Sequence, residues 1–353
     1  MSRQLLLLVA LSTGIDRLVA QRLPTLVREE RAPVTIAGAA GSLATWIGDS
    51  TIALADVEEQ RVMLIDLATG RVRTAGRPGE GPGEFRGVNP PLRAPDGSLL
   101  VVDSRLRRAT VLTPGLAVRR VVGLPVVLST LLGWDGTTLL AVWYDFSRTM
   151  TPVLGRLRLT TDEQAEAVPV VRLDSLFGGI KREPFSLPPV VVAAAGSSDN
   201  IYLARVDEYR ILKLNAQRRA VRSYERRDVP VRRFSPQEID AEAGRIRAAG
   251  AAPVPPAAAA KARQILAGLV KPFFTINGLS EDSQGRLWVV SARQENGQTE
   301  VDVFAATGQL LGTVTMRGHV QSLSWNGNRV AAVVERGEGE ERLGVIDLYR
   351  LGR

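Results

Sequence analysis

Three polar residues recur at one position of a repeated pattern and are the first candidates for chemistry. Asn89, Asn277 and His319 each lie eight residues before the glycine of a polar turn. Amide and imidazole groups can bind a small ligand or hold an ion. Glu84, five residues before Asn89, is the nearest carboxylate and would have to reach in from a loop. We favour the competing interpretation, in which these side chains satisfy turn and strand-end backbone groups, as Asn commonly does.

Other chemical signatures in the chain are weak. The single His and the absence of Cys argue against thiolate zinc sites, disulfides and a Cys nucleophile. No Ser carries the local signature of a nucleophile, and His319 would be its only base. The glycine-rich loop at 76–85 lacks the Gly-Lys-Ser/Thr of a phosphate-binding loop. Its carboxylates, Glu80 and Glu84, could chelate Ca²⁺, but its glycines are better explained by a tight backbone crossing.

Six repeated units position these candidates. Each unit has a polar or glycine turn, a strand of β-forming residues, a looser connection and a second strand. The same count of eight residues gives Ser42, Leu128 and Val192 in the remaining units. A single blade of this kind cannot bury both faces, so the units must stack around an axis. The first turns are Asp49-Ser50, Asp96-Gly97, Asp135-Gly136, Asp199-Asn200, Gln284-Gly285 and Asn326-Gly327.

Two intervals between turns are long. The first contains 168–189, which we expect to be loop-like. The second contains a helical pattern: Ser235 and Glu238 form a capping box around Pro236, and a second helix is predicted for 257–270 after the prolines at 253–256. We therefore predict a helical hairpin at 235–271, inserted between blades four and five. Packing against the propeller rim is favoured over a lid on the central channel.

The stretch Gly79-Glu-Gly-Pro-Gly-Glu-Phe85, together with Pro95-Asp96-Gly97 and the strand after it, resembles one blade of an NHL-type β-propeller. With the helical insertion and Gly285-Arg-Leu-Trp-Val289, the chain is similar to bacterial exported six-bladed propeller proteins of unknown function. The resemblance implies an all-β six-bladed β-propeller over 32–353. Related NHL-type lyases bind a metal through several His, which this chain lacks. Gluconolactonase-like propellers use Glu, Asn and Asp on a divalent cation; Asn89 and Asn277 could play such parts, but no inner-strand carboxylate has the matching offset.

Composition limits the kinds of partner and the cellular compartment that we expect for this protein. The net charge is +8, yet only four of the 45 basic residues are Lys and the Arg residues are spread along the chain, which indicates codon bias rather than a nucleic-acid surface. We interpret three Arg pairs as solvated strand edges: Arg218-Arg219, Arg226-Arg227 and Arg232-Arg233. Residues 1–21 have the charged start and short apolar run of a signal peptide. Without Cys a lipid anchor through a thiol is excluded, and no segment is long enough to span a membrane.

The sequence therefore predicts a periplasmic or extracellular propeller that uses one face to bind a protein, peptide or glycan, with no cofactor and no nucleic acid. The alternative is a hydrolase or lactonase at the central channel, around Asn89, Asn277 and His319. Calcium is expected only under this alternative. We lean against an enzyme.

Overall fold

The computed structural model describes residues 23–29, 34–36, 43–147, 151–159, 164–178, 191–249, 256–337 and 343–352. The predicted signal peptide, Ser42 and the prolines at 253–255 lie outside the described residues.

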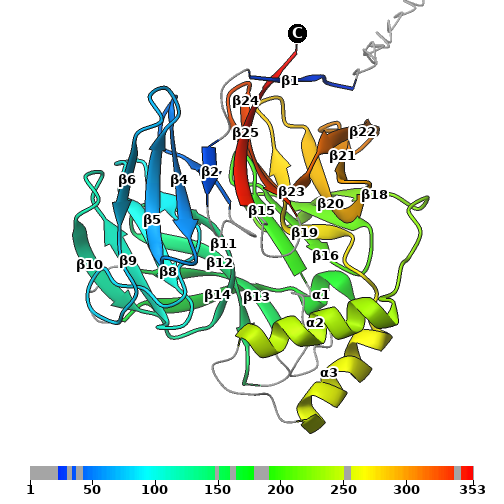
Figure 1. The fold of residues 1–353 in the computed structure, drawn as a ribbon, viewed down its shortest axis with the longest axis horizontal. Coiled ribbons are helices and arrows are strands. Elements are labelled where there is room, and N and C mark those ends of the chain that lie inside the picture. Colours follow the sequence, from blue (N-terminus) through cyan, green and yellow to red (C-terminus); the bar gives the residue numbers. More distant parts are fainter. Residues whose placement is uncertain are drawn as a thin grey trace, which may run out of the picture.

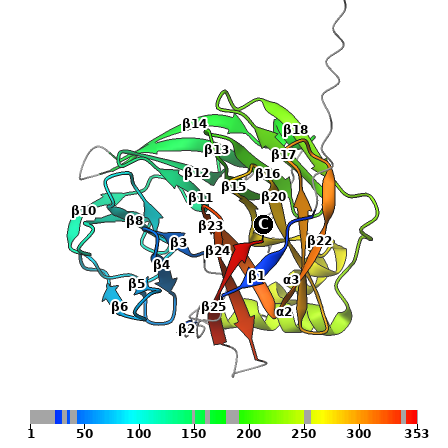
Figure 2. The same ribbon diagram turned by 90° about the horizontal axis from the view of Figure 1, so that it is seen from above.

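Four antiparallel sheets, each built from four consecutive strands, follow one another around a ring (Figures 1 and 2). Their order in each sheet is that of the chain, because only a few residues separate each strand from the next. The strands are β3 (Thr45–Trp46), β4 (Thr51–Asp56), β5 (Arg61–Asp66) and β6 (Val72–Ala75); β7 (Leu92–Arg93), β8 (Leu99–Asp103), β9 (Arg108–Leu112) and β10 (Val118–Gly123); β11 (Leu128–Trp134), β12 (Thr138–Asp145), β13 (Thr151–Arg158) and β14 (Glu166–Arg172); and β15 (Val191–Ala195), β16 (Ile201–Arg205), β17 (Arg210–Leu214) and β18 (Ala220–Glu225).

The rest of the ring is one nine-stranded sheet. Its two parts, β19–β22 and β23–β25, are joined by a single parallel pair, Asn277 with Ser322. The first described strands, β1 and β2, both pair antiparallel with β25. Its strands are β19 (Phe274–Glu281), β20 (Leu287–Glu295), β21 (Gln298–Phe304), β22 (Leu310–Arg317), β23 (His319–Asn326), β24 (Arg329–Arg336), β25 (Leu343–Leu351), β1 (Leu26–Arg28) and β2 (Val34–Ile36).

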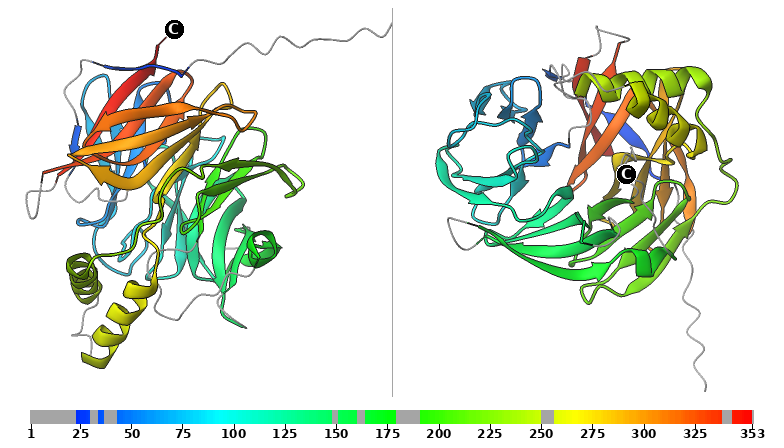
Figure 3. Two further views of the ribbon diagram at one scale, coloured as in Figure 1. Left: turned by 90° about the vertical axis from the view of Figure 1, so that its right-hand side faces the viewer. Right: turned by 90° about the horizontal axis from the view of Figure 1, so that it is seen from below.

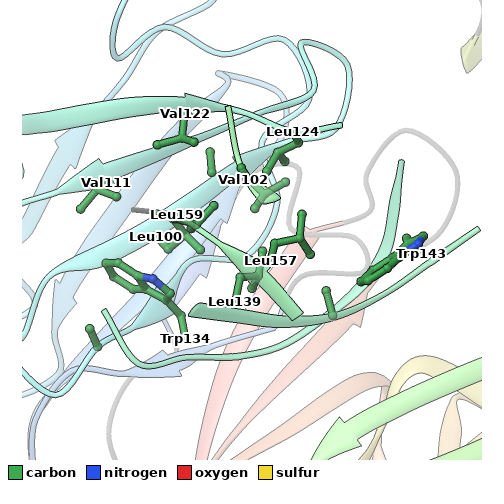
Figure 4. Packing of buried hydrophobic residues seen from close by; sticks show 14 of the residues in the cluster. Leu100, Val102, Val111, Val122, Leu124, Trp134, Leu139, Trp143, Leu157 and Leu159 are labelled. Atoms are coloured by element: carbon green, nitrogen blue, oxygen red, sulfur yellow. The ribbon is translucent and has the colours of Figure 1, made fainter. Parts of the chain in front are cut away.

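The innermost strands form a closed ring. β3, β7, β11, β15, β19 and β23 contact one another in succession, and β23 returns to β3. Apolar clusters fill the spaces between neighbouring groups of strands, and the one between β7–β10 and β11–β14 contains Leu100, Trp134 and Trp143 (Figure 4). The last cluster joins β4 and β5 to β24 and β25. The architecture is thus all-β and β-propeller-like, as the repeated pattern predicts.

The expectation of a loop at 168–189 is wrong for its first part. Residues Glu166–Arg172 form β14, the outer edge strand of its sheet, and Asp174–Phe177 forms the short helix α1. Pro169 lies inside β14, and Pro is tolerated in an edge strand because one side of such a strand has no ladder partner.

The predicted capping box is present. Ser235 N donates to Glu238 Oε2 at 2.9 Å, and Glu238 N donates to Ser235 Oγ at 3.3 Å. These bonds begin α2 (Pro236–Ala249), and α3 (Pro256–Gly268) follows. The backbone closes the base of this insertion where Lys271 N donates to Arg232 O at 2.8 Å. The two helices lie side by side below the ring (Figure 3).

Ionic contacts accompany the pairing of the first and last described strands. Glu29 accepts hydrogen bonds from Arg329 at 2.8 and 2.9 Å and from Arg350 at 2.7 Å. Burial alone would raise the pKa of Glu29, but the two guanidinium groups outweigh burial and lower it below its usual value. Arg28 pairs at 2.8 Å with Asp347, which is fully buried.

The stability that Glu29 gives to the pairing of the first and last described strands should therefore depend on pH. A carboxylate whose pKa is lower in the folded state stabilises that state above its unfolded pKa, and this stability is lost as the pH falls through the folded pKa. We expect Glu29→Gln to lower the free energy of unfolding by about 1–2 kcal/mol at pH 7. Thermal unfolding of both proteins from pH 7 to pH 3 should show the difference shrinking. A difference that is constant or grows on acidification would contradict this role of Glu29.

Candidate functional site at the centre of the ring

A pocket of about 130 Å³ opens where the inner strands of several sheets begin. Asn89, just before β7, and Asn277, in β19, both line it. The structure therefore brings together two residues that are far apart in the chain. The remaining polar lining is Ser129 and Thr130 of β11; the apolar lining is Leu43, Pro90, Leu92, Val102, Leu128, Leu131 and Ile276.

Asn89 is held by the backbone of its own sheet. Its Nδ2 donates to Gly87 O at 3.2 Å and to Val102 O at 3.1 Å, and its backbone N donates to Val102 O at 2.9 Å. These bonds continue the sheet beyond β7, which is only two residues long. Asn89 thus has the strand-end role that we favoured for it. Within the described residues no donor is bonded to its Oδ1 atom, which can therefore accept a hydrogen bond from a ligand.

Asn277 lies opposite Ser322, and not opposite His319. The hairpin after β19 has five residues between its last pair, Glu281 and Leu287, whereas the hairpin after β23 has two, because Asn326 pairs with Arg329. A count from the turn glycine therefore runs three residues too far in the last unit. Counted from the last paired residue of the inner strand, the polar equivalents of Asn277 among the described residues are Asn89, Thr130 and Ser322, and Val191 is the equivalent in β15. Thr130, which lines the pocket, was missed for this reason.

His319 is the first residue of β23, half-buried and paired in register with Glu335. It does not line the pocket formed by Asn89 and Asn277. The structure therefore does not bring the only imidazole of the chain to these two amides.

Glu84 stays within the glycine-rich loop. Its carboxylate accepts a hydrogen bond from Gly81 N at 2.8 Å and pairs with Arg77 at 2.7 Å. The bond from Gly81, and then the Arg77 guanidinium, lower the pKa of Glu84. An ionised carboxylate that closes its own loop is not a general acid for the pocket, which it does not line.

The packing of the backbone explains the glycines of the loop at 76–85, as the sequence predicts. Arg108 donates to three of its carbonyls, those of Glu80, Gly81 and Glu84. Phe85 is fully buried between the sheets β3–β6 and β7–β10. A Cβ on Gly76, which has φ of +100°, would lie 2.6 Å from the Phe85 ring. The loop is therefore a packed crossing between two sheets.

The central pocket presents neutral chemistry. Its lining, in the part of the chain that the structure describes, contains amide and hydroxyl groups on an apolar wall and neither carboxylate nor imidazole. Ile276 is 51% exposed beside Asn277. Among the same described residues, no three His, Asp or Glu side chains are grouped so that they could hold a metal. Such a lining can donate and accept hydrogen bonds and contact apolar groups, but it has no side chain that ordinarily moves a proton at neutral pH.

Comparisons with solved structures concern the fold. A member of the DUF4221 family from Bacteroides vulgatus ATCC 8482 aligns over 94% of this chain and 99% of its own, with a TM-score of 0.58 and 10% identity. A protein of Bacteroides fragilis NCTC 9343 described as exported aligns over 94% and 95%, with a TM-score of 0.55 and 10% identity. The fold is β-propeller-like. At this identity the likeness extends to no activity, but the predicted similarity to exported bacterial propeller proteins is confirmed at the level of fold.

A luciferin-regenerating enzyme aligns over 92% of this chain and 95% of its own, with a TM-score of 0.49 and 10% identity. No protein-family model and no curated protein matches the chain. Within the described residues, no helix has the length and apolar character needed to cross a membrane.

Proposed function

We propose that this chain is an exported six-bladed β-propeller that binds a peptide, protein or glycan at the centre of one face without catalysing a reaction. The neutral lining of the central pocket carries this proposal: Asn89, Asn277 and Thr130 supply hydrogen bonds, while Ile276 supplies exposed apolar surface. Binding sites commonly combine an apolar wall with a few placed polar groups. Export to the periplasm or the cell exterior agrees with the apolar start of the chain at residues 1–21.

Six blades are proposed from the ring of inner strands. Six first strands contact each other in succession, and an apolar cluster separates β19–β22 from β23–β25, as clusters separate the other sheets. We infer that β19–β22 is the fifth blade. β23–β25 with β1 and β2 is the sixth, and the Asn277–Ser322 pair bridges the two.

Peptide and glycan arrays probed with the purified protein test the binding role. Ile276→Asp should lose the array signal, because it places a charge on the apolar wall, and Asn277→Ala should weaken the signal about tenfold through a lost hydrogen bond. Asn328→Ala, at an exposed turn, is the matched control and should bind as the native protein does.

A parallel assay tests the enzymatic alternative. The native protein is analysed for bound metal and is incubated with glucono-1,5-lactone and p-nitrophenyl acetate, with and without Ca²⁺. We expect neither stoichiometric metal nor turnover. Hydrolysis that requires Ca²⁺ and disappears in both Asn89→Ala and Asn277→Ala would replace the binding proposal with a lactonase-like one, in which amide oxygens contribute to cation binding.

A further inference from the structure

A second and larger pocket lies away from the central one. It has a volume of about 330 Å³ and shares no lining residue with the central pocket. Its lining joins the turn before β17, the segment after β18, and strands β20–β22. Arg232 and Phe273, which flank the helical insertion, also line it. Its volume is in the lower part of the range of small-molecule sites.

A buried polar network forms its floor. Asp302 accepts hydrogen bonds from Tyr209 Oη at 2.5 Å, Arg226 Nη1 at 2.7 Å and Thr313 Oγ1 at 2.6 Å. Arg226 also pairs with Asp228. Burial, and then the Asp302 carboxylate, raise the pKa of Tyr209, so the phenol stays protonated and remains a donor. The polar groups of this floor bond to one another, and its charges are already compensated.

Arg293 is different, because no residue that the structure describes forms an ion pair with it. Its guanidinium lies over the Phe273 ring, with Cζ 4.3 Å from the centroid. Its Nε and Nη2 are buried without a hydrogen-bond partner, and among the described residues its guanidinium forms no ion pair. Burial, and then the charge of Arg232, lower the pKa of Arg293. The Arg293 side chain as a whole is half-buried, but buried N–H groups without acceptors are costly, and an anionic group of a ligand would offset that cost.

A carboxylate on the same pocket is also unpaired. Glu300 is exposed at the rim, near enough to Arg293 for their charges to interact, yet it forms no ion pair with any residue that the structure describes. The lining as a whole contains three Arg and three acidic residues. The site thus has equal numbers of positive and negative side chains, and Arg293 and Glu300 form no ion pair with any described residue. Such a site favours a ligand with one positive and one negative group over a simple anion.

We propose that this pocket binds a small zwitterion of the amino-acid or short-peptide class. The ligand carboxylate pairs with Arg293, and its ammonium group pairs with Glu300. Its side chain packs on the apolar wall made by Val229, Pro230 and Phe273. Planar guanidinium groups suit carboxylates, and stacking on Phe273 holds the guanidinium of Arg293 in place for this contact.

A thermal-shift screen of the common amino acids and of dipeptides, each at about 10 mM, tests the proposal, because a ligand that binds only the folded state raises its melting temperature. The strongest binder is then compared by calorimetry with its deaminated acid, its decarboxylated amine and inorganic phosphate. Both analogues should bind at least about tenfold more weakly than the amino acid. Arg293→Ala should weaken binding by about 10- to 100-fold.

Glu300→Gln separates recognition from stability, because its side chain is at the exposed rim. It should weaken binding of the zwitterion and leave the deaminated acid unaffected. Arg119→Ala, an exposed Arg paired with Asp96 on another sheet, and Asn277→Ala in the central pocket should bind as the native protein does. The proposal is overturned if no amino acid or dipeptide raises the melting temperature. Equal affinity for phosphate and the amino acid, or native affinity in a folded Arg293→Ala protein, would overturn it as well.

Discussion

Asp302→Ala is expected to lower the free energy of unfolding by about 3–5 kcal/mol, because it removes one partner of a buried ion pair. Asp302 is 4% exposed and accepts three side-chain hydrogen bonds. Its loss leaves the hydroxyl of Tyr209 without an acceptor and Arg226 without its buried partner. Urea denaturation at pH 7, followed by tryptophan fluorescence, measures the loss.

A matched control isolates the effect of burial. Asp228 pairs with the same Arg226, but its side chain is 67% exposed. Asp228→Ala should therefore cost less than about 1 kcal/mol, since exposed ion pairs contribute little. Asp302→Asn, which keeps the shape and one acceptor, should fall between the two. If Asp302→Ala lowers the free energy of unfolding no more than Asp228→Ala does, the buried hydrogen bonds of Asp302 do not stabilise the fold as expected.

Phe85→Ala is expected to have a comparable effect, about 3–5 kcal/mol, because it removes a fully buried ring and leaves a cavity between two sheets. The ring also lies against Gly76, so the cavity would open beneath the glycine-rich loop. Phe85→Leu should cost less, because much of the buried volume is kept. The same denaturation assay applies.

Two further variants show whether the loop and the ring act as one unit. Gly76→Ala introduces a Cβ 2.6 Å from the Phe85 ring at a φ of +100° and should also destabilise the protein. Arg86→Ala, which removes only the exposed ion pair with Glu80, should be near neutral. If Phe85→Ala unfolds at the same urea concentration as Arg86→Ala, the loop does not contribute to the core as described.

Local features were predictable because their causes are local. The capping box of Ser235 and Glu238 depends on residues three apart, and both of its hydrogen bonds are present. The turn at Asp96 and Gly97 likewise follows from a side chain that accepts a bond from the backbone two residues on, at Ser98. Such interactions form within a few residues whatever the rest of the chain does.

The candidate site was predictable only in part. Asn89 and Asn277 meet as the repeat implies, but Ser322, not His319, lies opposite Asn277. Two hairpins of different length shift the register, and residue types alone do not reveal which residues of a hairpin pair. The burial of Arg226 could not be predicted from residue types either. Its neighbour Arg227 is 93% exposed, as expected of a solvated strand edge, whereas the Arg226 side chain is 17% exposed and binds the buried Asp302.

Two strands of each repeated unit, their turns, the helical insertion and the propeller-like class could be predicted from the sequence, since turn residues, runs of β-forming residues and helix caps depend on short segments of the chain. The tertiary structure was needed to show how β1 and β2 pair with β25 and which residues share each pocket. Tyr209, Arg293 and Asp302 belong to different strands or turns, and they meet because two sheets pack side by side around the ring. Packing between sheets depends on register and on the closure of the whole ring, and no short segment contains that information.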